Sequence, residues 1–109
     1  MEKKDLLKDT IKHIDIKSYD STQLIDAMRD MSFTSRDTAR ATDILMMMVG
    51  EKECTNILTI AGSTSAAGCM QVYVDMVRNK MVDVVVSTGA SIIDMDLFEA
   101  LGYKHYKGH

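Results

Sequence analysis

The chain has 109 residues, enough for one small domain. Hydrophobic residues make up 46% and charged residues 27%, as in an ordinary globular protein. The net charge of −3 gives no general attraction to nucleic acid or to an anionic membrane, so neither is expected as a partner. No apolar run approaches the roughly 20 residues that span a bilayer, and residues 1–5 lack the apolar core of a signal peptide. We therefore expect a cytoplasmic protein.

The first half of the chain predicts an irregular lead-in followed by two helices. Residues 1–19 are charged and weakly patterned, and we expect them to be extended or irregular. Residues 20–50 predict a helical pair. Asp20 or Ser21 caps the first helix, residues 32–34 interrupt the pattern, and Ser35 caps a longer helix that ends before Gly50 at the C′ position.

Three consecutive methionines, residues 46–48, lie in the longer helix. Methionine clusters occur on soft binding surfaces. However, Ala41, Leu45 and Met48 share one helical face, which favours a core or interface stripe. One or two of the methionines then point elsewhere, toward further chain or a partner subunit.

Residues 54–102 predict a β-α-β-α unit. We expect strands at Thr55–Ile60 and Val82–Ser87, a helix between them, and a final helix from Ile92 to Leu101 that Gly102 ends. Crossovers of this kind are right-handed, so the strands should be parallel, and the apolar second strand is typical of one covered on both faces. The order α-α-β-α-β-α opens a doubly wound α/β sheet with flanking helices. Two strands alone do not make a stable parallel sheet, so we interpret the chain as a fragment.

Small residues fill the loop after each predicted strand, at 61–68 and at 87–91. Ligands of open α/β sheets bind beyond the carboxyl ends of the strands, where glycine lets the backbone approach and a helix N-terminus favours phosphate. Neither GxGxxG nor GxxxxGK[ST] is present. Two interpretations stay open: a nucleotide or phosphate site, or small residues that only make tight turns. For Gly89 we expect a turn with positive φ.

The remaining chemistry-bearing side chains give weak signals. Asp94 and Asp96 follow the second loop, where they suit ribose hydroxyls or a cationic amine, although an acidic first helical turn is favourable by itself. Cys54 and Cys69 are interpreted as small hydrophobic residues. The three histidines are scattered, two of them in a terminus expected to be ragged. We expect no metal site, and no catalysis by this chain unaided.

Specific, collinear segments from Ile14 onward resemble the deoxyhypusine synthase family, including its bacterial and archaeal synthase-like members. The matching segments are Ile25-Asp26-Ala27-Met28, Ser32-Phe33, Arg36-Asp37, Ala39-Arg40-Ala41-Thr42-Asp43-Ile44-Leu45, Cys54-Thr55, Leu58-Thr59-Ile60-Ala61-Gly62-Ser63, Asn79-Lys80-Met81-Val82-Asp83-Val84, Val86-Ser87-Thr88-Gly89-Ala90, Asp96-Leu97-Phe98-Glu99-Ala100-Leu101-Gly102 and His105-Tyr106-Lys107-Gly108. Thr34-Ser35 replaces a common Gln-Gly pair, and Ala66 stands where many members have proline.

The resemblance implies a Rossmann-like fold with bound NAD, in a homotetramer whose active sites are shared between subunits. By the same resemblance, spermidine is oxidised with NAD, and its aminobutyl group passes through an imine on an enzyme lysine. The acceptor is a lysine of the hypusine-bearing translation factor, or a small amine in some synthase-like relatives, as in homospermidine-type polyamine synthesis.

Carried over to this chain, the first NAD-contacting loop of the family matches Gly62, Ser63, Thr64, Ser65 and Ala66, and the second matches Thr88, Gly89 and Ala90. Asp94 falls on an acidic position that reaches both cofactor and polyamine.

The chain covers about the N-terminal third of a typical family member, and none of its lysines matches the imine-forming one. We therefore expect residues 1–109 to be the N-terminal part of an NAD-binding domain, inactive as a synthase by itself. Two alternatives are a non-catalytic nucleotide-binding module that acts as a regulatory partner, and an inert truncated product.

Overall fold

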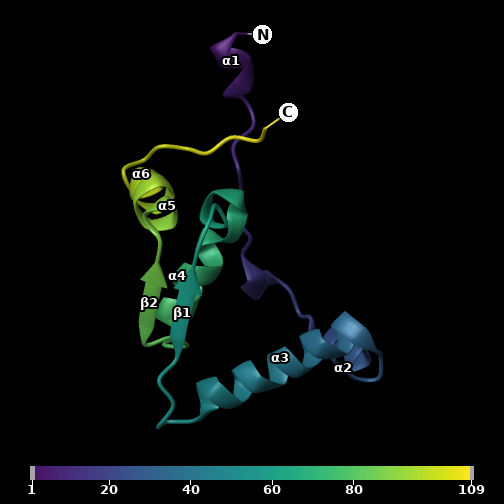
Figure 1. Ribbon diagram of the computed structural model, residues 1–109. Helices are drawn as coiled ribbons and strands as arrows, with labels where there is room; N and C mark the ends of the chain where they lie inside the picture. The colour runs from purple at the N-terminus through teal and green to yellow at the C-terminus, as the bar shows by residue number, and fades with distance from the viewer. Residues whose placement is uncertain (1, 109) are drawn as a thin grey trace.

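The computed structural model describes residues 2–108 and has the expected α/β class, with helices around a small parallel sheet (Figure 1). The first half contains α1 (Lys3–Leu6), the 3-10 turn η1 (Ile16–Ser18), α2 (Thr22–Arg29) and α3 (Phe33–Gly50). The second half contains β1 (Ile57–Ile60), the π-helical turn η2 (Ser65–Cys69), α4 (Met70–Arg78), β2 (Val84–Ser87), α5 (Gly89–Ser91), the π-helical segment η3 (Ile92–Leu97) and α6 (Phe98–Ala100).

The two strands are parallel, as the crossover rule predicted, and pair from Ile57 with Val84 to Ile60 with Ser87. Both begin two residues later than expected, because Asn56 and Asp83 form a different junction there. The backbone N–H of Asn56 donates to Asp83 Oδ2 at 2.7 Å, and the N–H of Asp83 donates back to Asn56 O at 2.8 Å. This exchange ties the starts of the two strands together before the ladder begins.

The apolar second strand is not covered on both faces in the part of the chain that the structure describes. Val84, Val85 and Val86 are all exposed, Val86 to 54%. The buried apolar core is small: Ile60 of β1, Met95 of η3 and Ala39 of α3. The described residues therefore do not supply the cover that the apolar pattern of β2 predicts, which agrees with the interpretation of the chain as a fragment.

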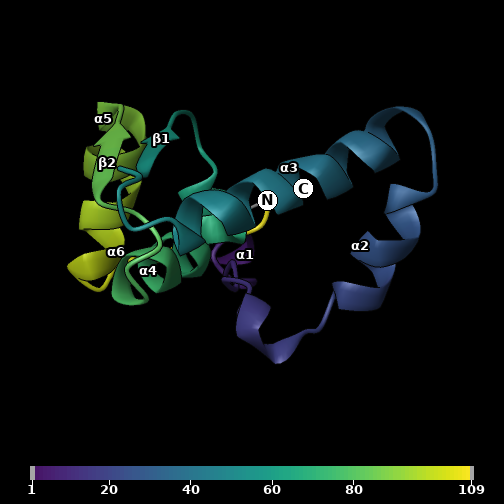
Figure 2. The ribbon, with the colours of Figure 1, turned by 90° about the horizontal axis from the view of Figure 1, so that it is seen from below.

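The expected helical pair is present, but its boundaries differ. α3 begins at Phe33, which has φ +55°, and Ser32 is its N-cap. Residues 33–34 therefore belong to the helix and do not interrupt it, and Ser35 is not its cap. Gly50 is the last helical residue and not a left-handed C′ residue, because Glu51 ends the helix in an extended conformation. Figures 1 and 2 show α2 and α3 as an arm that extends away from the strands.

The proposed methionine stripe is not covered by the described residues. Ala41 and Leu45 are exposed, Met48 is half-buried, and Met46 and Met47 are 64% exposed. The core interpretation of this face is therefore wrong here. An interface remains a proposal.

The N-terminal lead-in is more ordered than expected. It contains α1 and η1, and residues 9–17 run along α4 toward α2 (Figure 1). Thr10 pairs with Tyr106 in an antiparallel bridge, the N–H of Ile14 donates to Gly68 O at 2.9 Å, and Lys17 Nζ donates to Asp75 Oδ1 at 2.8 Å. The lead-in is thus bonded to the β-α-β unit at several points.

Candidate functional site

The two small-residue loops leave the sheet side by side. Ile60 pairs with Ser87 at the ends of the strands, and the N–H of Thr88 donates to Ile60 O at 3.2 Å. The hydroxyl of Ser91, fully buried, donates to Gly62 O at 2.7 Å and so joins the two loops directly. Ser91 lay outside the predicted site, although the Ser-Thr-Gly-Ala-Ser run contained it.

The first loop combines an open turn with a tightly packed one. Gly62 has φ +76°, and no atom lies within 4 Å of the place where a side chain would begin. Gly68 has φ +111°, and a β-carbon there would lie 3.1 Å from the carbonyl oxygen of Lys12. Glycine is therefore required at both positions by backbone conformation, and at Gly68 also by close approach.

The hydroxyl-bearing residues of the first loop differ in surroundings. Ser63 and Thr64 are exposed, and Thr64 Oγ1 accepts a hydrogen bond from the hydroxyl of Tyr73 at 2.8 Å. Ser65 is fully buried, and its Oγ has no partner among the described residues. Ala66 is half-buried in η2, a turn in which Gly68 departs from helical φ and ψ.

The second loop is shorter than expected, because a helix begins within it. Thr88 is extended, with φ −74° and ψ 157°, and precedes the helical run of α5, η3 and α6 that starts at Gly89. The expected positive φ at Gly89 is wrong: the glycines with positive φ are Gly62, Gly68 and Gly102. Gly89 and Ala90 thus present first-turn helical N–H groups beside the first loop.

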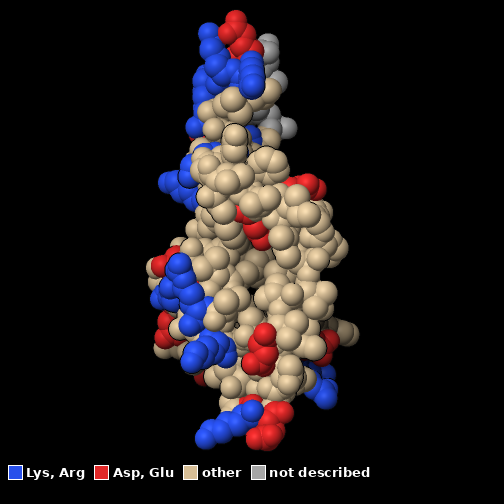
Figure 3. All heavy atoms as spheres, turned by 90° about the vertical axis from the view of Figure 1, so that its left-hand side faces the viewer, with Lys and Arg blue, Asp and Glu red and all other residues tan. Residues whose placement is uncertain are grey.

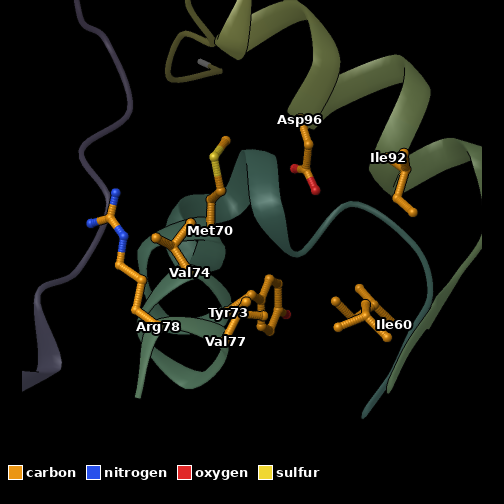
Figure 4. Close-up of a pocket in the computed structure, with 9 residues that line it drawn as sticks. Ile60, Met70, Tyr73, Val74, Val77, Arg78, Ile92 and Asp96 are labelled. Carbon is orange, nitrogen blue, oxygen red and sulfur yellow. The ribbon is translucent and has the colours of Figure 1, made fainter. Parts of the chain in front are cut away.

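An apolar groove of about 330 Å³ adjoins the loops, between α4 and the start of η3. Figure 4 shows Tyr73, Met70 and Val77 of α4 on one side and Ile92 with Asp96 on the other. Asp96 faces this groove, and its Oδ1 is buried without a partner in residues 2–108. Asp94 is exposed and does not line the groove.

The surface around the strands is largely uncharged. Figure 3 views the molecule from the side of β2 and α5, where uncharged residues surround a central hollow, acidic and basic side chains are scattered around it, and further charged side chains gather around α1.

A cluster that sequence reasoning missed lies behind the first loop. Glu99 Oε2 lies 2.7 Å from Nε2 of His13, and Glu99 Oε1 lies 2.7 Å from Nδ1 of His105. Burial acts to raise the pKa of Glu99, but the hydrogen bonds and charge of the two imidazoles together lower that pKa below its ordinary value. The terminus expected to be ragged is bonded here instead.

Within residues 2–108, no three His, Cys, Asp or Glu side chains are grouped to hold a metal ion. In the same part of the chain, no helix has the length and apolar character needed to cross a membrane.

The family model of deoxyhypusine synthase matches residues 23–109, four-fifths of the chain and both loops. The chain belongs to the deoxyhypusine synthase family. It is 60% identical over 106 residues to a "Deoxyhypusine synthase-like protein" of Caulobacter vibrioides, covering 97% of this chain and 29% of that protein. A protein of the same name from Coxiella burnetii is 58% identical, covering 97% of this chain and 30% of the relative.

A more distant relative, the "Probable deoxyhypusine synthase 2" of Methanosarcina acetivorans, is 36% identical over 95 residues, covering 87% of this chain and 27% of that protein. The chain thus spans about 30% of the length of the curated relatives it matches. No solved structure matches the chain.

Proposed function

We propose that this chain forms the opening part of a Rossmann-like NAD-binding domain in an aminobutyl transferase related to deoxyhypusine synthase. The intact protein would oxidise spermidine with NAD and transfer the aminobutyl group to an amine acceptor. Family membership supports the reaction class. The joining of the two loops through Ser91 and Gly62 is the structural observation that supports a shared ligand site.

The residues present fit a dinucleotide in two respects. Gly62 leaves its backbone open to close approach, and Gly89 and Ala90 offer first-turn N–H groups from the neighbouring strand's loop. The apolar groove lined by Tyr73 and Met70 offers a surface for an aromatic ring beside these polar groups. We propose that Gly62 to Ala66 and Thr88 to Ala90 contact one NAD molecule.

Calorimetry of the intact protein tests this proposal. Gly62→Val places a branched side chain at φ +76° where the ligand must approach, so NAD affinity should fall at least about tenfold, roughly 1.4 kcal/mol. Met47→Leu, an exposed change on α3, should leave affinity within about twofold. Wild-type affinity in a folded Gly62→Val variant would contradict the cofactor assignment.

The acidic group that contacts the polyamine is a separate question. The resemblance points to Asp94, but Asp96 faces the groove and has an oxygen without a partner among the described residues. We propose both as candidates for binding a protonated amine. Asp96→Asn and Asp94→Asn, compared by KM for spermidine, assign the role to whichever variant raises KM. An unchanged KM for spermidine in both variants would show that neither Asp94 nor Asp96 belongs to the polyamine site.

The acceptor is either a lysine of the hypusine-bearing translation factor or a small amine. The relatives at 50–60% identity bear the name "Deoxyhypusine synthase-like protein", whereas "Probable deoxyhypusine synthase 2" is 36% identical, and this contrast favours testing the small amine as well. Mass spectrometry of reactions with NAD, spermidine and either acceptor distinguishes the two. A homotetramer is proposed on the resemblance alone, and a cytoplasmic location stays a prediction from the sequence.

A further inference from the structure

One buried carboxylate joins three segments that are distant in sequence. Glu99 of α6 accepts from His13 of the N-terminal segment and from His105 of the C-terminal segment, and its side chain is only 15% exposed. An ionised carboxylate has no proton to donate, so both ring nitrogens must carry hydrogen. The N–H of Ile11 also donates to His105 O at 2.8 Å, which fixes the two segments to each other.

The N-terminal segment in turn packs against the first loop. The two neighbours of His13 contact Gly68: the N–H of Ile14 donates to Gly68 O at 2.9 Å, and Lys12 O lies 3.1 Å from the place of a β-carbon on Gly68. Gly68 has φ +111° and immediately precedes Cys69 and α4. Whatever holds His13 in place therefore also holds the end of the first loop.

We infer that Glu99 is a positioning residue, which through His13 holds residues 11–14 against Gly68 and so fixes the conformation of the first loop. Imidazole side chains change charge between about pH 5 and 8, and a charged ring binds a carboxylate more strongly than a neutral one. The imidazoles of His13 and His105 are the charged groups that act on Glu99. The hydrogen bonds of Glu99 with His13 and His105 should therefore strengthen as pH falls from 8 to 5.5.

This inference deepens the proposed function, because Gly68 closes the loop proposed to bind NAD. Its test needs no ligand. Hydrogen exchange of the intact protein, read by mass spectrometry as protection factors at pH 8 and pH 5.5, compares segments 9–14 and 63–70 with strand segments 57–60 and 84–87. In the wild type, the first two segments should gain protection about fivefold at pH 5.5, while the strands stay unchanged.

Glu99→Gln separates positioning from bulk stability. Its amide NH₂ can donate to a ring nitrogen only when that nitrogen has lost its proton, so the variant fits neutral imidazoles and opposes charged ones. Protection of segments 9–14 and 63–70 should therefore fall, not rise, at pH 5.5. Glu53→Gln, an exposed change in the turn that precedes β1, should behave as wild type.

A second variant covers the case in which Glu99→Gln does not fold. His13→Gln keeps an N–H donor toward Glu99 but cannot become charged, so the gain at pH 5.5 should shrink. The inference is overturned if wild-type protection of the two segments is independent of pH, or if both variants alter the strand segments as much as the loop. NAD titration of the same variants is read separately, so either proposal can fail alone.

Discussion

At the scale of single residues, two glycines with opposite surroundings allow a matched test. Gly68→Ala forces φ +111° on a residue with a β-carbon, which also meets Lys12 O at 3.1 Å, so it should lower the free energy of unfolding by at least about 1 kcal/mol. Gly50→Ala, in α3 with no atom within 4 Å, should raise it by up to about 1 kcal/mol. Urea unfolding measures both, and equal effects would contradict the described loop.

The buried carboxylate of Asp75 predicts a pH dependence of stability. Asp75 is 4% exposed, and hydrogen bonds from Lys17 and then Gln71 lower its pKa although burial opposes them, while Asp75 raises the pKa of Lys17. The lowered pKa of Asp75 stabilises the fold at pH values above the pKa of the unfolded carboxyl, and this stabilisation is lost as pH falls through the pKa of the folded one. The stabilisation from the raised pKa of Lys17 is lost only as pH rises through that raised pKa.

Asp75→Asn should therefore lower Tm between about pH 4 and pH 10, and the difference from wild type should shrink as pH falls below the ordinary aspartate pKa of about 3.9 and vanish only below the lowered pKa of folded Asp75. Thermal melts across this range measure it. Asp37→Asn, an exposed change on α3, should stay within about 2 °C at every pH. A constant deficit down to pH 2 would show that the Asp75 effect is packing and not charge.

At the scale of elements, the sequence pattern predicted the features that neighbouring residues determine. The parallel strand pair and the placement of two loops at one edge followed from apolar runs, small residues and crossover handedness. The Glu99 cluster could not be found this way, because His13 and Glu99 are 86 residues apart and neither position has a periodic signature. The boundary of α3 was missed because Phe33 enters the helix at φ +55°, which pattern alone does not indicate.

Asn56 is the residue where three elements meet. Its buried side-chain amide donates to Met48 O near the end of α3 at 3.3 Å, and its Oδ1 accepts from Cys54 Sγ at 3.5 Å, while its backbone bonds to Asp83 before β2. Asn56→Ala leaves Met48 O without this partner and should cost about 1–2 kcal/mol in urea unfolding. Thr55→Ala, an exposed neighbour, should cost less than about 0.5 kcal/mol.

At the scale of the whole molecule, the chain exposes more surface than its mass requires. Its accessible surface is 8480 Å². A compact protein of 12.2 kDa exposes about 6,100 Å². The radius of gyration is 16.9 Å, against about 13 Å for a compact domain of this length. The arm of α2 and α3 and the uncovered valines of β2 account for much of this apolar exposure.

Exposed apolar surface of this extent predicts self-association of the isolated chain. Sedimentation at increasing concentration should show species larger than a monomer. Met47→Lys places a charge on the exposed face of α3, where the wild-type side chain is 64% exposed, so it should weaken association without unfolding the helix. Gln23→Lys adds the same charge at an exposed position of α2 outside that face and should leave association unchanged. A monomeric wild type with one sharp thermal transition would show that these surfaces need no partner, and equal effects of the two lysines would assign any change to net charge instead of the methionine face.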